Sequence, residues 1–237
     1  MEQTFTLLSF GPDGWGDEIA FGVLVTIGLA FATLPLGLIA GFFLSLAKQS
    51  DEKILRMASE VYTTIFRGLP ELLTLFLVYY GLQIGIRQLL LALGIETTFE
   101  INSFLAGMIA LGVVFSAFCS EVFLSAFRAI PAGQYEAGSA LGLNRFQTMF
   151  NIILPQLIRI ALPGLGNLWM ILLKETALVS VIGLPDILRQ AGIAARVSKE
   201  AFLFYGIACL LFLALALLSS ILINRIERHV ERSGIRV

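Results

Sequence analysis

Five stretches of this chain are long and apolar enough to be membrane-spanning helices, and this feature constrains the fold more than any other. A helix needs roughly 18 or more apolar residues to cross about 30 Å of hydrocarbon. Hydrophobic residues make up 57% of the 237 residues and charged residues 14%, which excludes an ordinary soluble domain. We therefore expect an all-α membrane protein with five transmembrane helices. The expected spans are residues 19–47, 57–90, 104–127, 160–181 and 201–223.

The distribution of Lys and Arg between the loops predicts the orientation of these spans. One side of the membrane would hold residues 48–56, residues 128–159 and the C-terminus, which together carry ten Lys and Arg residues. The other side carries four, counting Arg87 near the end of the second span. Because cytoplasmic loops are enriched in Lys and Arg, we expect the segment 1–18 to be periplasmic or interfacial and the basic tail 227–237 to be cytoplasmic.

Two of the expected spans contain features that interrupt a regular helix. Arg67, Gly68 and Pro70 lie close together in the second span, where Gly and Pro break a helix and an arginine cannot face lipid. We interpret Arg67 and Pro70 mainly as architecture. The fourth span is irregular at residues 163–166, and Lys174 and Glu175 interrupt its apolar run.

Residues 128–159 contain no apolar run of 18 residues and carry an amphipathic pattern instead. The pattern predicts a short helix with a face of small residues beside a single carboxylate. That face consists of Glu136, Ala137, Ala140 and Leu141. Gly142 follows and permits a bend or a close approach of the backbone.

The second half of the same stretch predicts an apolar knob. Phe146, Met149 and Phe150 recur at i, i+3 and i+4, a spacing that a groove in a partner protein could accept. Pro155 marks the entry into the next apolar segment. The alternative interpretation is a plain amphipathic helix at the membrane interface.

The residue inventory argues against an enzyme. The sequence has no GxxxxGK[ST] loop for ATP phosphates, no HExxH and no CxxC pair. Its single histidine, His229, lies in the basic tail, and Cys119 and Cys209 lie in separate apolar segments without metal-ligand spacing. We therefore expect no catalytic residue, no metal site and no nucleic-acid partner.

Several segments together resemble the permeases of polar-amino-acid ABC importers. They are residues 66–81, 118–128, 134–155 and 173–183, and the resemblance extends over residues 19–226. Within that family the chain is most similar to the paired permeases of histidine, lysine–arginine–ornithine and opine uptake systems. The resemblance implies a type I importer permease fold in a bacterial inner membrane.

The resemblance also assigns residues 128–159 as the cytoplasmic coupling loop. The residues expected to contact a partner ATPase are Glu136, Ala137, Gly138, Ala140, Leu141, Gly142, Phe146, Ile152, Leu154 and Pro155. One departure is visible, because the family usually has alanine where Gly138 stands. The implied partners are a second, similar permease (the same chain or a different one), two ATP-binding subunits, a periplasmic solute-binding protein and an amino-acid or opine substrate. No cofactor is expected in this chain, since the partner ATPase would use ATP and Mg²⁺.

An intramembrane carboxylate, Glu121, lies in the third span. A charge there costs at least about 2.5 kcal/mol unless it is paired or faces water. Glu121 could be the counter-charge for a substrate ammonium group or a structural partner of Arg67, and the sequence leaves both interpretations open.

A second polar group lies in the fourth span. We expect Glu175, Thr176 and Ser180 to be candidates for the substrate pathway and Lys174 to be a structural charge. The alternative is that these residues form a polar packing face between two permease subunits.

Two other classes of protein remain open at this stage. An ion-coupled secondary transporter would often show internal repeats, and none is evident here. A non-transporting membrane scaffold would explain a partner-docking stretch, but it would not explain broken spans and several intramembrane charges.

Overall fold

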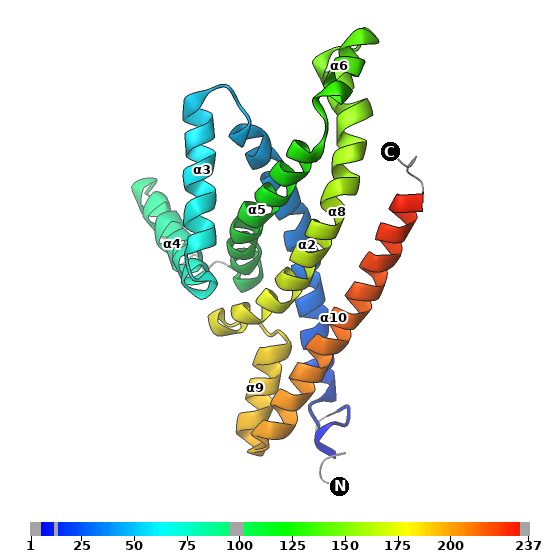
Figure 1. Cartoon of the computed structure of the whole chain (residues 1–237). Helices are drawn as coiled ribbons and strands as arrows, with labels where there is room; N and C mark the ends of the chain where they lie inside the picture. Colours follow the sequence, from blue (N-terminus) through cyan, green and yellow to red (C-terminus); the bar gives the residue numbers. More distant parts are fainter. Residues whose placement is uncertain (1–5, 12–13, 95–101, 233–237) are drawn as a thin grey trace.

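The computed structural model describes residues 6–11, 14–94 and 102–232, and this part of the chain is helical (Figure 1). The first half holds α2 (Gly16–Lys48), α3 (Lys53–Gly68), α4 (Glu71–Ala92) and α5 (Ser103–Ala129). The second half holds α6 (Ala132–Ala140), α7 (Arg145–Thr148), α8 (Leu154–Glu175), α9 (Ile187–Ser198) and α10 (Ala201–Arg232). A π-helical turn, Met149–Ile153, joins α7 to α8, and a 3-10 helix, Thr176–Ile182, follows α8.

Within the described residues, five helices are long and apolar enough to cross a membrane, as the sequence predicted. They are Gly16–Lys48, Glu71–Ala92, Ser103–Ala129, Arg145–Ile182 and Ala201–Val230. The helix bounds differ from the expected ones in three places. The expected second span, 57–90, is two helices, because the chain is extended at Leu69 and Pro70. The fourth helix begins at Arg145 rather than near residue 160, and the last continues past residue 223 to Arg232.

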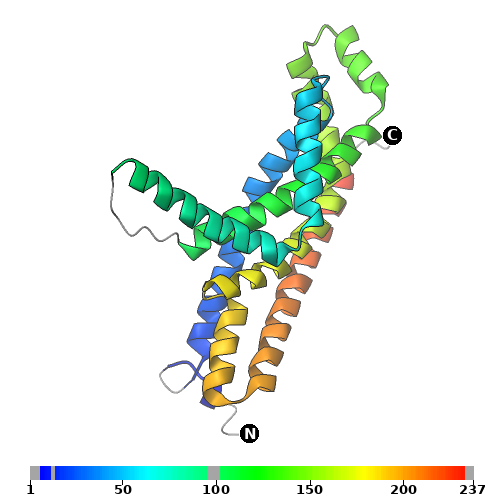
Figure 2. The same ribbon diagram turned by 90° about the vertical axis from the view of Figure 1, so that its left-hand side faces the viewer.

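Helix α5 is the centre of the bundle, and α2 packs closely along it. A Cβ atom added at Gly37 would collide with the Phe115 ring, and one at Gly41 would lie 2.5 Å from Cys119 Cβ. These two glycines therefore let the backbone of α2 approach α5, the usual role of small residues between membrane helices. Helices α4 and α10 are mostly exposed, and α4 extends away from the other helices (Figure 2).

Helices α6 and α7 and the C-terminus lie at one end of the bundle, and α9 and the N-terminus lie at the other (Figure 1). Helix α8 passes through Pro163 without a break and changes to the 3-10 helix only after Glu175. Gly183, with a φ of 97°, ends the 3-10 helix in the left-handed region that favours glycine. The expected interruption at residues 174–175 is therefore a change of helix type, which a 3-10 segment makes possible without losing backbone hydrogen bonds.

A fully buried carboxylate, Asp186, caps the start of α9, and the next residue joins this helix end to α2. Asp186 Oδ1 accepts a hydrogen bond from the Arg189 backbone N–H at 2.9 Å, and Thr26 Oγ1 on α2 accepts one from the Ile187 N–H at 3.3 Å. Asp186 Oδ2 has no hydrogen-bond partner among the described residues. Burial raises the pKa of Asp186 from its ordinary value of 3.8 to about 6, against the lowering effect of the helix N–H groups and Arg189.

Replacing Asp186 by asparagine is expected to stabilise the protein above neutral pH. The stability associated with protonated Asp186 is fully present below about pH 4 and is lost as the pH rises through about 6, and the difference between the two pKa values corresponds to roughly 3 kcal/mol. The asparagine side chain would keep an oxygen to cap α9 and carry no charge. Thermal midpoints of the purified protein should agree most closely at pH 4 and be higher for Asp186→Asn at pH 8. A lower midpoint for the variant at pH 8 would contradict this account.

Candidate functional site

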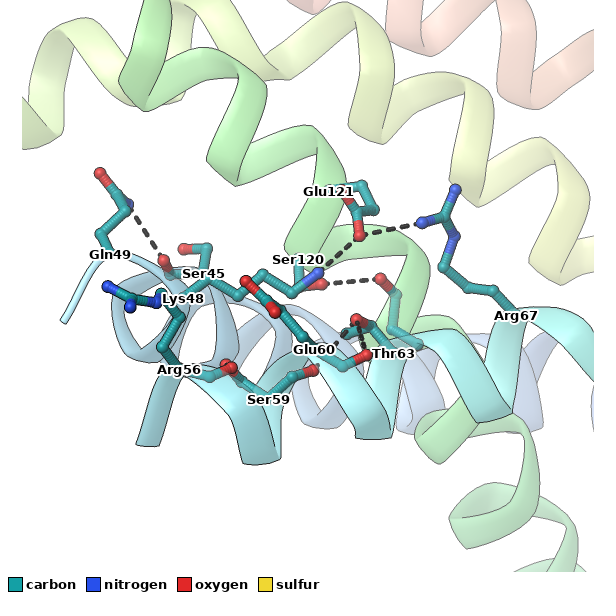
Figure 3. Close-up of polar contacts among 11 residues, drawn as sticks. Ser45, Lys48, Gln49, Arg56, Ser59, Glu60, Thr63, Arg67, Ser120 and Glu121 are labelled. Carbon is teal, nitrogen blue, oxygen red and sulfur yellow. Dashed lines mark hydrogen bonds and ion pairs between the residues drawn. The ribbon is translucent and has the colours of Figure 1, made fainter. Parts of the chain in front are cut away.

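Three charged side chains meet on α5. Glu121 Oε1 lies 2.5 Å from Lys48 Nζ and 2.9 Å from Arg67 Nη1. Figure 3 shows the two cations on either side of the carboxylate. Lys48 is the last residue of α2 and Arg67 lies in the last turn of α3, so the charge cluster of Lys48, Arg67 and Glu121 joins three helices. The sequence suggested Arg67 as a partner of Glu121, whereas it indicated a loop position for Lys48.

The members of this charge cluster differ in their access to solvent. The Lys48 side chain is 6% exposed, Glu121 is 34% exposed and Arg67 is 43% exposed. Arg67 also lies over the Phe118 ring, 5.7 Å from its centroid. Because two cations share one carboxylate, the cluster has a net positive charge, and its exposed side is Arg67. It can therefore hold three helices together and still offer a cation to an anionic group.

Two carboxylates lie together at the end of α8. The carboxyl groups of Glu175 and Glu71 are within hydrogen-bonding distance of each other, and both are half-buried. Glu71 is the first residue of α4, directly after Pro70. Sequence reasoning missed Glu71, because only the break at Leu69 and Pro70 turns this residue toward α8. Two carboxyl groups so close together in an apolar setting share a proton or take up a cation, because two unshielded negative charges repel each other.

The other polar residues expected near Glu175 lie in different surroundings. Thr176 is fully buried, and its hydroxyl donates to the Leu173 carbonyl at 2.8 Å, which satisfies it across the junction of α8 and the 3-10 helix. The Ser180 carbonyl accepts a hydrogen bond from Arg189 Nη1 at 3.1 Å, so this residue helps to hold α9. Lys174 is exposed. Among Lys174, Glu175, Thr176 and Ser180, Glu175 is the residue that lies against a second carboxyl group, that of Glu71.

Helices α6 and α7 form a compact hairpin with an exposed apolar edge. Gly142, between them, has a φ of 74°, and no atom lies within 4 Å of a Cβ built there. The Asn144 side chain accepts from the Gln147 N–H at 2.9 Å, while Gln147 Oε1 accepts from the Asn144 N–H at 3.0 Å, and this capping box begins α7. A positive φ and a capping box so close together give the hairpin a defined bend.

The residues expected to contact a partner divide into an exposed group and an anchoring group. Leu141 and Phe146 are largely exposed, and Phe146 stacks on Phe150 with centroids 4.3 Å apart. The exposed group is Glu136, Ala137, Ala140, Leu141, Gly142, Phe146 and Pro155. Ile152 and Leu154 are half-buried against the main core instead. We name the exposed group together with Phe150 the hairpin surface.

Gly138 shows why the chain departs from alanine at this position. A Cβ atom there would lie 2.6 Å from both the Cγ2 and Oγ1 atoms of Thr148. The buried glycine therefore lets α6 lie directly against α7. Glycine weakens a helix by about 1 kcal/mol relative to alanine, and α6 bears this cost to make the close contact with α7.

The described residues contain no group of three or more His, Cys, Asp or Glu side chains that could bind a metal ion. What the structure presents is a pair of oppositely charged sites on either side of the break between α3 and α4, and an exposed apolar hairpin surface at one end of the bundle. This arrangement suits binding and docking.

Comparison with known proteins identifies the family. The family model described as "Binding-protein-dependent transport system inner membrane component" matches residues 33–232. The nopaline transport system permease protein NocQ of Agrobacterium fabrum is 39% identical over 232 residues, covering 98% of each chain. The histidine/lysine/arginine/ornithine transport system permease protein HisQ of Salmonella typhimurium is 36% identical, covering 91% of this chain and 94% of the relative. The arginine ABC transporter permease protein ArtQ of Escherichia coli is 35% identical, covering 88% and 92%.

Solved structures agree with this assignment. A crystal structure of an amino acid ABC transporter with histidines matches with a TM-score of 0.76 and 33% identity, covering 91% of this chain and 95% of that one. The MetNI methionine ABC transporter, in an inward-facing conformation, matches with a TM-score of 0.72 at 19% identity, which shows a shared fold. The chain therefore belongs to the family of binding-protein-dependent transport system inner membrane components, and it is the permease subunit of an ABC importer whose ATPase is a separate subunit.

Proposed function

We propose that this permease imports a basic amino acid or an opine across the bacterial inner membrane. The observation that carries the proposal is the pairing of two oppositely charged sites at the break between α3 and α4. Arg67, before the break, belongs to the positively charged cluster with Glu121 and Lys48. Glu71, after the break, lies against Glu175.

These two sites complement a zwitterion with an additional positive charge. Arg67 is exposed enough to bind a substrate carboxylate, the role for which a guanidinium is best suited. Glu71 and Glu175 would bind an ammonium or a cationic side chain. The names of the relatives HisQ and ArtQ support a basic amino acid, since histidine, lysine, arginine and ornithine carry side chains that are or can become cationic, and the name of NocQ supports an opine. Thr176 and Ser180 support this site by holding the 3-10 helix in place.

The proposed assembly contains a second permease, two cytoplasmic ATP-binding subunits and a periplasmic solute-binding protein. The ATP-binding subunits would bind ATP and Mg²⁺ and dock on the hairpin surface, while this chain carries no cofactor. An ion-coupled secondary transporter and a non-transporting scaffold remain the alternatives. Purifying the native complex and identifying its other subunits and its bound small molecule by mass spectrometry tests the proposal. A complex that holds an apolar molecule, or an acidic one without any cationic group, would contradict the substrate assignment.

The proposed orientation places the hairpin surface and the C-terminus in the cytoplasm. A reporter fused after Arg232 should therefore read cytoplasmic, and one inserted after Lys199, in the turn between α9 and α10, should read periplasmic. The loop position Thr97 should read periplasmic too, although it lies outside the described residues. The reverse readings would show that the orientation is wrong.

A further inference from the structure

Helix α3 differs from the five candidate spans in having two exposed faces of opposite character. Its third face packs on α5, where Tyr62 Oη contacts the Val113 carbonyl at 3.1 Å and Ser116 Oγ at 2.9 Å. Ser59 and Thr63, on this same face, are buried. The packing fixes the rotation of α3 and therefore decides which side chains its exposed faces present.

The first exposed face is apolar. Ile54, Val61 and Ile65 lie on it at positions i, i+7 and i+11, and all three are exposed. These side chains need a partner that is not water, such as lipid. Val61 lies near the middle of this face.

The second exposed face is polar. Its members lie at i, i+3, i+7, i+11 and i+14, which places them on one side of a helix, and all five are exposed: Lys53, Arg56, Glu60, Thr64 and Arg67. Figure 3 shows Arg56, Glu60 and Arg67 along the same helix. The polar face therefore runs from the loop after α2 to the charge cluster of Lys48, Arg67 and Glu121. At its midpoint the Glu60 carboxylate makes no hydrogen bond or ion pair with the described residues.

The membrane setting makes this free carboxylate informative. Helix α3 lies between two helices that can span the membrane, α2 and α4, and it packs on a third, α5. A charge that faces lipid near the membrane centre costs about 2.5–3.5 kcal/mol on insertion scales. A row of charges on one face of such a helix is tolerated where that face borders water. The polar face and the apolar face thus mark two different environments around one helix.

We propose that the polar face of α3 forms one wall of a water-filled passage, which leads from the charge cluster to the hairpin end of the bundle. On this wall, Glu60 is the group that binds the cationic end of the substrate. The proposal rests on the proposed function for its substrate, and on the geometry of α3 for its wall. Between Arg56 and Arg67, Glu60 is the carboxylate on the polar face, so it provides the wall's counter-charge for an ammonium or guanidinium group.

Cysteine labelling in the assembled complex tests the wall. In a background with Cys119 and Cys209 replaced by alanine, Thr64→Cys and Ile65→Cys place a thiol on the polar and apolar faces, because successive residues point about 100° apart around a helix. A charged, membrane-impermeant methanethiosulfonate reagent should modify Thr64→Cys at least about tenfold faster, because the reactive thiolate forms in water and not in lipid. Equal modification rates of the two thiols, or protection of both, would show that the polar face does not line a water-filled passage.

Uptake kinetics test the role of Glu60. Glu60→Gln should raise the KM for a basic amino acid several-fold and change the KM for a neutral one little, because the amide keeps the shape and loses the charge. Glu52→Gln, an exposed carboxyl at the start of α3 outside the polar face, is the matched control and should change neither. Equal effects of the two variants, or an unchanged KM in Glu60→Gln, would overturn the assignment. Absence of uptake in the unsubstituted complex would count against the proposed function instead. The difference in labelling rate between the two cysteine variants does not depend on uptake, so it still tests the wall.

Discussion

The Glu121→Gln variant should assemble poorly, because the substitution leaves Lys48 without its counter-charge. The Lys48 side chain is 6% exposed, so water cannot replace the lost carboxylate. Breaking a fully buried pair costs about 3–5 kcal/mol. Since Glu121 and Arg67 are partly exposed, we expect roughly 2–3 kcal/mol here, which is still large against the stability of a typical domain. The yield of intact complex on size-exclusion chromatography and its thermal midpoint measure the effect.

The choice of second substitution distinguishes the partners of Glu121. Adding Lys48→Met to Glu121→Gln should restore assembly, because it removes the buried, unpaired ammonium and keeps an apolar side chain of similar length. Adding Arg67→Gln should restore less, since Arg67 is 43% exposed and is already hydrated. If the Lys48→Met double variant assembles and still lacks uptake, the charge of Glu121 also acts in the passage. Normal assembly and uptake in the single Glu121→Gln variant would contradict both roles.

The Gly142→Asp variant should insert normally and lose substrate uptake. Gly142 has a φ of 74°, which Asp and Asn tolerate better than other side chains, and its surroundings are open, so the hairpin should keep its bend. The new carboxylate would lie on the hairpin surface beside Leu141, where a docked ATPase would bury it. An unpaired charge buried at an interface costs about 2–5 kcal/mol, so we expect uptake and transport-linked ATPase activity to fall by more than about tenfold.

Gly142→Asn is the matched control for this prediction. Asparagine has the same shape and the same tolerance of the left-handed region, and it carries no charge, so it should retain most uptake. Glu136→Ala should reduce coupling without affecting insertion, because Glu136 is exposed on the same surface. Wild-type uptake in a well-expressed Gly142→Asp variant would show that this surface is not the docking site.

The sequence predicted features that depend on local patterns. Long apolar runs identified the spans, and the break at Arg67–Pro70 was visible because Gly and Pro end a helix. The partners of the charged residues were harder to predict. Lys48 looked like a loop residue, and its role depends on the depth at which α2 crosses α5. The contact between Glu71 and Glu175 joins residues about 100 positions apart, so it depends on how α4 and α8 pack.

In residues 128–159, packing makes the structure differ in two ways from what the sequence predicted. Residues 145–159 were expected to be part of the coupling loop, yet they continue into α8 through a π-helical turn. Ile152 and Leu154 consequently pack against the main core, and their contact with a partner stays a prediction. Gly138 departs from the family pattern because Thr148 occupies the space of a Cβ atom, a reason that the sequence could not reveal.

Uptake by the reconstituted complex tests the central claim most directly. The permease, its partner permease, the ATP-binding subunits and the solute-binding protein would be placed in proteoliposomes, and accumulation of radiolabelled arginine would be followed. We predict accumulation with ATP and Mg²⁺, and none when the phosphate-binding lysine of the ATPase is replaced by alanine, whatever ion gradient is imposed. Accumulation driven by a proton or sodium gradient without ATP would contradict the account.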